Sequence, residues 1–185
     1  ATDDGRAIIC NGSIQAFAPA GITTYDIPSG VNAIANQVFR GASELVYVNI
    51  PTGVKSIGEL AFFECTSLRE IYIPDSVNSI ERSAFQYCSG LDRMTIGKGL
   101  TSVGEYAFQY CSGLTSITLP NSLTSIGNYA FQYCSGLTNI TLPNSLTSIG
   151  EKTFKDCSGL TSLTLPNSLT SIGSYAFYGC TGLTS

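Results

Sequence analysis

The stretch of residues 114–136 reads LTSITLPNSLTSIGNYAFQYCSG, and residues 137–159 follow at once as LTNITLPNSLTSIGEKTFKDCSG. Seventeen of the 23 aligned positions carry the same residue. Working outward in the same register gives seven full units, at 22–44, 45–67, 68–90, 91–113, 114–136, 137–159 and 160–182, and residues 183–185 begin an eighth. A unit of this length is too short to bury a core alone, so the repeat predicts a solenoid whose coils stack on one another.

Each unit opens with a near-alternating apolar pattern. In the fifth unit Leu114, Ile117 and Leu119 occupy positions 1, 4 and 6 with Thr and Ser between them, which predicts a short strand with one face inward. Position 7 is proline in six of the seven units and Gly97 in the fourth, so the strand should end there in a turn. Stacked coils would place these strands side by side in one parallel sheet.

The second half of the unit predicts a short helix after a second extended pair. Gly127, Ala130, Phe131 and Cys134 fall at i, i+3, i+4 and i+7, the inward stripe of a helix. The spacing of Ser and Glu predicts a capping box at its start, and glycine at the last position of five units predicts a left-handed end. The capping pairs are Ser56 with Glu59, Ser102 with Glu105 and Ser148 with Glu151, and the glycines are Gly90, Gly113, Gly136, Gly159 and Gly182.

Two of the inward positions form columns along the stack. One column holds a phenylalanine from every unit, and the other holds the six cysteines that lie 23 residues apart, from Cys65 to Cys180. Adjacent cysteines would lie within disulfide range, but equivalent side chains point in parallel, which favours free buried thiols. A metal site is disfavoured because a linear row of sulfurs offers no tetrahedral cage.

The residues before the first unit do not follow the repeat. Residues 7–10 and 13–17 are apolar segments on either side of Asn11-Gly12, which predicts a hairpin with a type I′ turn. We expect residues 1–21 to cap the first coil. Residues 183–185 should stop inside a strand, and the bare sheet edge there would allow self-association through the C-terminal end.

The amino-acid composition excludes several classes of function for this chain. The 185 residues carry a net charge of −4, which argues against nucleic acid as a partner, and the absence of histidine excludes a histidine triad or a His-containing zinc site. No apolar run approaches the roughly 18 residues that a membrane-spanning helix needs. We find no catalytic constellation and expect no enzyme and no cofactor.

The unit resembles that of the BspA-like (treponemal-type) leucine-rich repeat family. The pattern L-x-x-I-x-L-P-x-x-L-x-x-I-G-x-x-A-F-x-x-C-x-x is met almost letter for letter by residues 114–136, and the resemblance covers about 160 of the 185 residues. It implies an α/β fold: a right-handed, curved leucine-rich-repeat solenoid with a parallel sheet on one face and short helices on the other. It also implies a cell-surface or secreted protein, usually bacterial, that adheres to host extracellular-matrix or cell-surface proteins.

The outward positions 2, 3 and 5 of each strand are the candidate ligand-binding residues. In the late units they are almost all Thr, Ser and Asn, whereas the second to fourth units vary and supply the tyrosine and arginine side chains that anchor partners. The alternative is a solvated sheet face with cross-strand ion pairs. The candidate set is Tyr47, Asn49, Arg69, Glu70, Tyr72, Asp92 and Arg93.

A second candidate surface is a tyrosine flank at unit positions 16 and 20. It would align between coils as a stripe for sugar stacking, or its rings would pack on one another and cover the groove between coils. Its residues are Tyr87, Tyr106, Tyr110, Tyr129, Tyr133 and Tyr175. The sequence therefore predicts a non-catalytic adhesion or protein-recognition module acting through the strand-lined face. The alternatives are an inert rigid spacer that displays another domain, and carbohydrate binding along the tyrosine flank.

Overall fold

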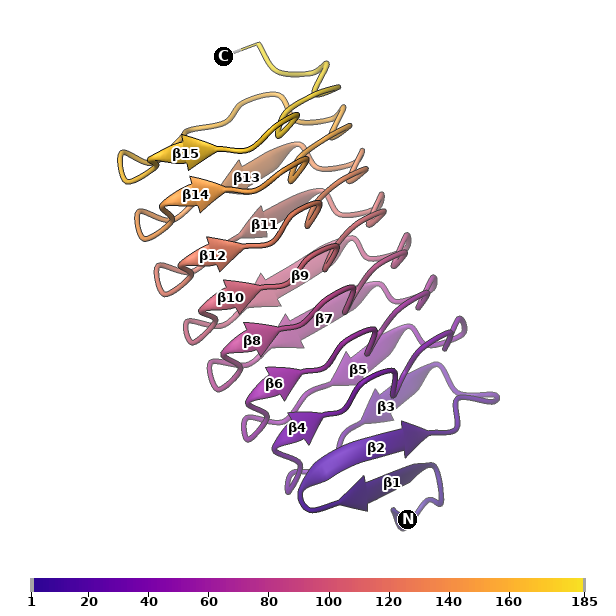
Figure 1. The fold of residues 1–185 in the computed structure, drawn as a ribbon. Coiled ribbons are helices and arrows are strands. Elements are labelled where there is room, and N and C mark those ends of the chain that lie inside the picture. The colour runs from indigo at the N-terminus through magenta and orange to yellow at the C-terminus, as the bar shows by residue number, and fades with distance from the viewer. Residues whose placement is uncertain (1, 185) are drawn as a thin grey trace.

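The computed structural model describes residues 2–184, which form fifteen strands and no helix (Figure 1). The first six coils cross the molecule in two extended segments, a longer one at the start of the unit and a two-residue one after the turn, and the seventh has only the two-residue one. The longer strands are β3 (Thr24–Asp26), β5 (Tyr47–Asn49), β7 (Glu70–Ile73), β9 (Arg93–Ile96), β11 (Ser116–Thr118) and β13 (Asn139–Thr141). The short strands are β4 (Ala33–Ile34), β6 (Ser56–Ile57), β8 (Ser79–Ile80), β10 (Ser102–Val103), β12 (Ser125–Ile126), β14 (Ser148–Ile149) and β15 (Ser171–Ile172).

The strands stack in the register that the repeat predicts. The longer strands form a six-stranded sheet in the order β13-β11-β9-β7-β5-β3, and each pairs in parallel with a strand 23 residues away, as in Thr24↔Tyr47. The short strands β4 to β12 pair in parallel in the same way, with Ser102↔Ser125 as an example, and β14 pairs with β15 in a separate two-stranded sheet. The prediction of a parallel solenoid of leucine-rich-repeat type is confirmed.

The chain before the first coil forms an antiparallel hairpin of β1 (Ala7–Cys10) and β2 (Ser13–Phe17). Asn11 and Gly12 at its turn have φ values of 51° and 75°, the left-handed conformation that a type I′ turn requires. Strand β2 then pairs in parallel with β4, so the hairpin lies over the first coil. Ala1, at the start of the predicted cap, lies outside the described residues.

The predicted helix in each unit is wrong, and with it the assignment to an α/β class. Residues 127–134 form consecutive turns in which Tyr129 and Tyr133 both have a φ of 62°, a value that an α-helix does not contain. Their N–H groups donate to the carbonyls of Glu151 and Lys155 in the next coil, each at 2.9 Å, instead of to carbonyls four residues back. A neighbouring coil supplies acceptors in register, so the backbone bonds between coils rather than within a helix.

The capping signals accordingly have other roles. Ser56, Ser102 and Ser148 lie in short strands, so no helix begins beside them. The glycines at the last unit position are not left-handed. A Cβ atom on Gly113 would lie 2.6 Å from the carbonyl oxygen of Ser89, so this position needs glycine because the main chains of adjacent coils approach closely.

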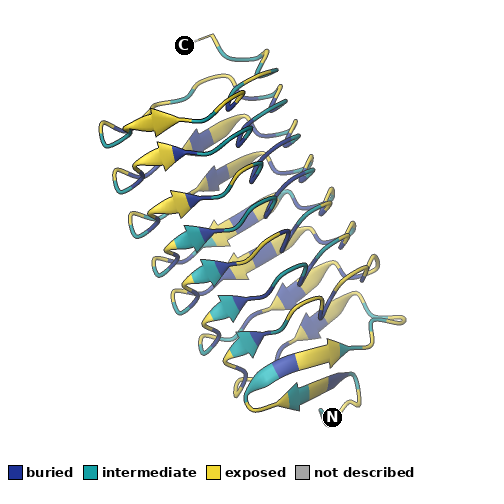
Figure 2. Cartoon of the chain, viewed as in Figure 1, coloured by how far each residue is buried: buried dark blue, intermediate teal, exposed yellow. Residues whose placement is uncertain are grey.

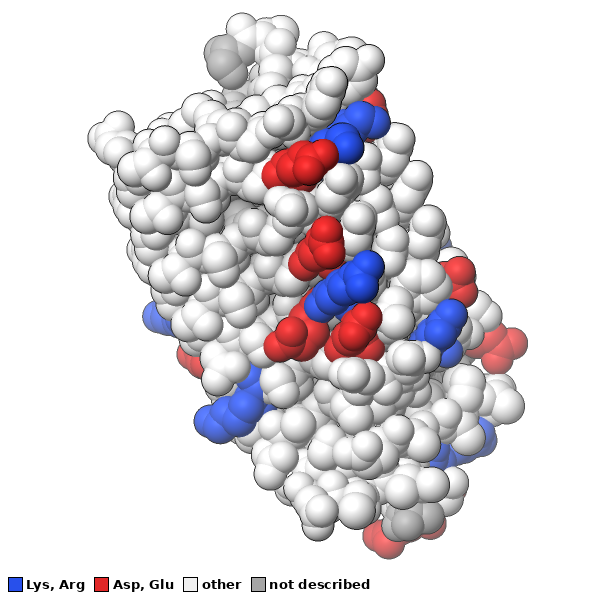
Figure 3. All heavy atoms as spheres, in the orientation of Figure 1, with Lys and Arg blue, Asp and Glu red and all other residues white. Residues whose placement is uncertain are grey.

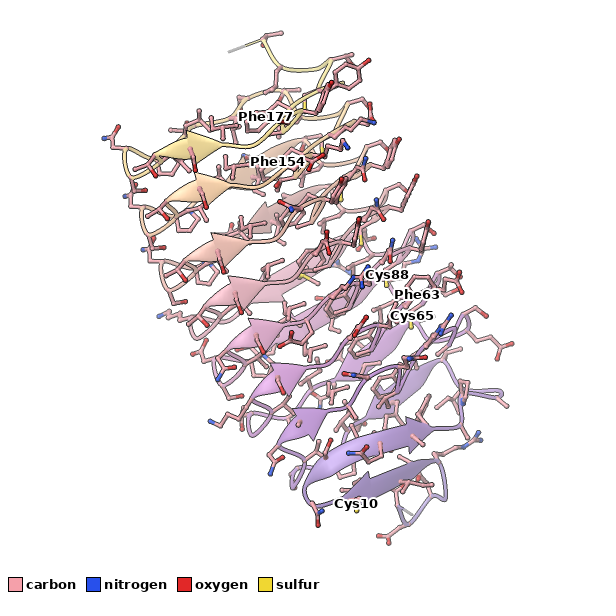
Figure 4. The ribbon with its side chains drawn as sticks, in the orientation of Figure 1. Cys10, Phe63, Cys65, Cys88, Phe154 and Phe177 are labelled. Carbon is pink, nitrogen blue, oxygen red and sulfur yellow. The ribbon has the colours of Figure 1, made fainter. Side chains whose placement is uncertain are left out.

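The phenylalanine column is the centre of the core. Its rings stack along the whole solenoid with centroid separations of 4.8–5.5 Å and interplanar angles of 16° or less, and Figure 4 labels its last two members, Phe154 and Phe177. The six rings from Phe39 to Phe154 are buried. Figure 2 shows buried residues alternating with exposed ones along the strands of the solenoid.

The last coil departs from the prediction. Residues 160–166 do not form a strand. Besides the turn bond from Leu160 N–H to Cys157, their main chain donates to the sixth coil at one place, from Thr161 N–H to the carbonyl of Thr138 at 3.3 Å. Leu165 and Ile172 are exposed because no further coil covers them within the described residues. Ser185, in the predicted eighth unit, lies outside that range.

Candidate recognition surface

The sheet brings the seven candidate residues together: five lie on the adjacent strands β5, β7 and β9, and Arg69 and Asp92 directly precede β7 and β9. Register pairs Tyr47 with Glu70 and Glu70 with Arg93, and the N–H of Asp92 donates to the carbonyl of Arg69 at 3.0 Å. We call this group the strand-face patch, and it consists of Tyr47, Asn49, Arg69, Glu70, Tyr72, Asp92 and Arg93. All but Asp92, which is half-buried, are exposed.

The charges of the patch are partly paired. Arg93 Nη2 lies 3.3 Å from Glu70 Oε2, and Arg93 Nε lies 3.5 Å from Asp92 Oδ1. Because these side chains are largely solvated, such pairs contribute about 0–1 kcal/mol. Within residues 2–184 no carboxylate lies within 4.0 Å of the Arg69 guanidinium. Arg69 is therefore a cation available to a partner, and Tyr47 and Tyr72 lie on the same face with exposures of 39% and 47%.

On the later coils, the side chains of the same face hydrogen-bond to the preceding coil. At unit position 2, Thr138 Oγ1 donates to the carbonyl of Thr115 at 3.0 Å, and Thr161 Oγ1 donates to that of Thr138 at 3.3 Å. Threonines at unit position 11 donate to the preceding coil in the same way. These hydroxyls stabilise the stack, which explains the uniform Thr surface. In the patch, Arg69 and Asp92 occupy position 2 and no such side-chain bond is present among the described residues.

The tyrosine flank forms two columns over the turns. Tyr87, Tyr110 and Tyr133 stack with centroids 4.8 and 4.5 Å apart, and Tyr106 stacks on Tyr129 at 4.8 Å. The ring faces are therefore covered by rings of neighbouring coils. Sugar stacking needs an open ring face, so this packing favours the interpretation in which the rings seal the groove between coils.

Two lysines of the sixth coil continue these columns by packing on tyrosine rings, a role that was not predicted from the sequence. Lys155 Nζ lies 5.1 Å from the Tyr133 ring centre and 5.5 Å from that of Tyr178, while Lys152 lies between Tyr129 and Tyr175 at 5.1 and 5.8 Å. Hydrogen bonding to Glu151 raises the pKa of Lys152 above its usual value. The sequence does contain an indication of this role, because both lysines occupy unit positions that are aromatic or Gln in the fifth and seventh units.

A row of glutamine side chains beside the tyrosines was also missed. The Gln86 amide donates to Gln109, and the Gln109 amide donates to Gln132. Gln109 and Gln132 are buried, so these bonds satisfy amide groups that would otherwise lose water. The recurrence of Gln at unit position 19 in three successive units is the signal that could have indicated the ladder.

Charged side chains on the face with the short strands are interleaved. Figure 3 shows acidic and basic residues gathered in a band over the segments that follow these strands, beside a broad surface without charge. Arg82 pairs with Glu105 at 3.7 Å in this region, and Lys152 pairs with Glu151 at 2.8 Å. The face therefore offers no field of a single sign.

The cysteine column consists of free thiols that hydrogen-bond between coils. The Cys88 Sγ–H donates to the carbonyl of Phe62 at 3.0 Å, and the same contact recurs from Cys65 to Cys180 at 3.0–3.1 Å. Figure 4 shows Cys65 and Cys88 next to each other in successive coils. Burial raises the pKa of Cys65 and of Cys134 to about 12 from the usual 9.0.

This burial predicts alkaline destabilisation. The thiols of the unfolded chain ionise near pH 9, and those of the folded protein ionise only at much higher pH. Their contribution to the free energy of unfolding is therefore complete below pH 9 and is lost as the pH rises toward 12. The loss is up to about 1.4 kcal/mol per pH unit for each thiol. We expect the urea midpoint to fall between pH 9 and 11. A Cys88→Ala/Cys111→Ala/Cys134→Ala variant, which repeats the alanine that the first unit carries at Ala42, should lose less over that interval. An identical pH profile for the two proteins would contradict the prediction and assign the loss to the tyrosines.

Comparison with known proteins identifies the repeat. The family model of the BspA-type leucine-rich repeat region matches residues 13–137 and 101–185 with six copies. The crystal structure of the T. pallidum leucine-rich repeat protein is 31% identical with a TM-score of 0.89, covering 94% of this chain and 83% of that one. A search of curated proteins finds no match. Within residues 2–184 no helix has the length and apolarity needed to cross a membrane.

Two longer solved proteins are similar over most of this chain. A leucine-rich cell surface protein from Faecalibacterium prausnitzii is 31% identical with a TM-score of 0.87, covering 100% of this chain and 55% of that one. A leucine-rich repeat protein from Bacteroides ovatus is 32% identical with a TM-score of 0.84, covering 93% and 46%. The chain thus spans about half the length of these two relatives. The family match over nearly the whole chain, with the stacked register described above, shows that this protein belongs to the BspA-type leucine-rich repeat family.

Proposed function

We propose that this chain is a non-catalytic recognition module, at the cell surface or secreted, that binds a partner protein through the strand-face patch. The observation that carries the proposal is the exposure of Tyr47 and Tyr72 beside the unpaired Arg69 on one sheet face. Tyrosine and arginine are the residue types that most often anchor interfaces. The partner class is a host extracellular-matrix or cell-surface protein, and adhesion is the function.

The family supports the surface location. The F. prausnitzii relative is described as a leucine-rich cell surface protein, and a solenoid whose core repeats leaves its outward positions free to vary. The second candidate function is a rigid spacer. It is favoured by the later coils, in which the Thr hydroxyls link coil to coil and large exposed side chains are absent from β11 and β13.

The two functions are separated by a binding experiment. The chain is immobilised and titrated with a panel of purified extracellular-matrix proteins. A Tyr47→Ala/Arg69→Ala/Tyr72→Ala/Arg93→Ala variant should weaken the affinity at least 100-fold, since a hot-spot residue contributes about 2 kcal/mol or more.

The matched control carries four alanines on the same face of later coils, at Asn139, Thr141, Ser162 and Thr164, and should bind as the natural chain does. Equal binding by the patch variant and the natural chain would contradict recognition through the patch. An absence of binding to every matrix protein by the natural chain would support the spacer.

A further inference from the structure

The turn of the fourth coil has a sequence that the other coils lack. Gly97-Lys98-Gly99 stands where the fifth coil has Pro120-Asn121-Ser122. A Cβ atom on Gly97 would overlap the main-chain nitrogen of Asp75, and one on Gly99 would overlap its carbonyl oxygen. The two glycines therefore let this turn close tightly on the turn of the third coil.

Hydrogen bonds hold the fourth coil against the third. Gly97 has the N–H that proline lacks, and it donates to the carbonyl of Ile73 at 2.8 Å. The N–H of Lys98 donates to Asp75 Oδ1 at 2.7 Å. Strand β9 consequently pairs with β7 over four residues, from Glu70↔Arg93 to Ile73↔Ile96.

On its opposite side, β9 has a shorter paired register. Strand β9 pairs with β11 only at Arg93↔Ser116, whereas β11 pairs with β13 at three positions. Beside this shorter pairing lies a groove of about 690 Å³, which we call the seam groove. It extends from β9 and β11 to the turns that follow them, where Lys98 and Asn121 line it.

The lining of the seam groove has a defined chemistry. Ile96 and Pro120 contribute partly exposed apolar surface above the buried Met94, Ile117 and Leu119, and Thr95 and Thr118 contribute hydroxyls. No acidic or aromatic residue lines it, and within residues 2–184 no carboxylate lies within 4.0 Å of Lys98 Nζ. In a chain of net charge −4, the groove is therefore a local site for an apolar ligand that carries a negative charge.

We propose that the seam groove binds an extended peptide segment of the partner, with an acidic side chain paired to Lys98. An extended peptide places alternate side chains on one face, so apolar residues would pack on Ile96 and Pro120 while intervening ones point to solvent. A carbohydrate would need an aromatic platform, which this groove lacks.

The proposal rests on the proposed function and extends it. Register pairs Tyr72 with Thr95 and Arg93 with Ser116, so the seam groove adjoins the strand-face patch. A partner docked on Tyr47 and Tyr72 could thus lay an extended segment along β9 toward Lys98.

The test uses peptides on the full chain. Fluorescein-labelled decapeptides of alternating valine and aspartate, and of alternating valine and asparagine, are titrated by fluorescence anisotropy. The aspartate peptide should bind at least 10-fold more tightly than the asparagine peptide. Lys98→Glu should remove that difference, while Lys55→Glu, a lysine outside the groove, should keep it.

A second variant fills the groove without relying on charge. Thr118→Tyr places in β11 the residue that Tyr72 already supplies at the same unit position, so the fold tolerates it. It should abolish peptide binding, and Thr164→Tyr, outside the groove, should leave binding unchanged, with equal urea midpoints for both.

Three results would overturn the proposal: no binding of the aspartate peptide, undiminished binding by Thr118→Tyr, or binding of an oligogalacturonate in place of the peptide. Failure here is distinguishable from failure of the proposed function. If Thr118→Tyr still binds the matrix protein and Tyr47→Ala/Arg69→Ala does not, the peptide site in the seam groove is contradicted. Recognition through the strand-face patch is then retained.

Discussion

Replacing Phe108 by alanine is expected to lower the free energy of unfolding by about 3–5 kcal/mol, the usual cost of deleting a buried aromatic ring. Phe108 is fully buried, and its ring lies 5.5 Å from that of Phe85 and 5.1 Å from that of Phe131. The substitution leaves a cavity between three coils and breaks the column in its middle. Urea denaturation followed by circular dichroism measures the loss.

The control is the same substitution at the end of the column. Phe177 is only partly buried and stacks on one ring, that of Phe154 at 5.5 Å. Phe177→Ala should therefore cost about half as much or less, since part of its surface is already in water. Equal losses at the two positions would contradict a core in which each coil is stabilised by both neighbours.

The second large effect is expected from Gly113→Ala. The added Cβ would meet the carbonyl oxygens of Ser89 and Leu91 at 2.6 and 3.1 Å, and both are main-chain atoms that cannot move aside alone. The third and fourth coils would have to separate locally. Overpacking of this kind costs about 1–3 kcal/mol, and the urea midpoint should fall accordingly.

Gly30→Ala is the matched control for this substitution. Nothing lies within 4 Å of a Cβ built on Gly30, and its φ is outside the left-handed region. Its effect should stay within about 0.5 kcal/mol. If Gly113→Ala were equally neutral, close approach of the main chains would not be the reason for glycine at the end of the unit.

The failed helix prediction shows where periodicity is ambiguous. Ala130, Phe131 and Cys134 are buried, as the helical spacing requires, but consecutive turns bring the same residues inward. Left-handed residues recur at unit positions 16 and 20, and Gly41 and Gly179 at position 20 were the clue. Most coils place tyrosine or another ordinary residue there, so the local sequence alone favoured a helix.

The candidate site was predictable in part. Once the 23-residue register is known, the adjacency of Tyr47, Glu70 and Arg93 follows from counting, and the structure places them on neighbouring strands. The pairing of Arg93 with two carboxylates, which leaves Arg69 without a partner, was not predictable because it depends on side-chain conformations. The seam groove beside β9 also escaped prediction, because its lining depends on how far neighbouring strands pair.

The sequence by itself determined the register, the inward columns of phenylalanine and cysteine, and the family, because an exact repeat forces every coil to bury the same positions against its neighbours. The tertiary structure decided how the backbone between those positions is hydrogen-bonded. Turns form in place of helices because the adjoining coils offer carbonyls in register. These hydrogen bonds between coils stabilise the turns, and no single unit contains them.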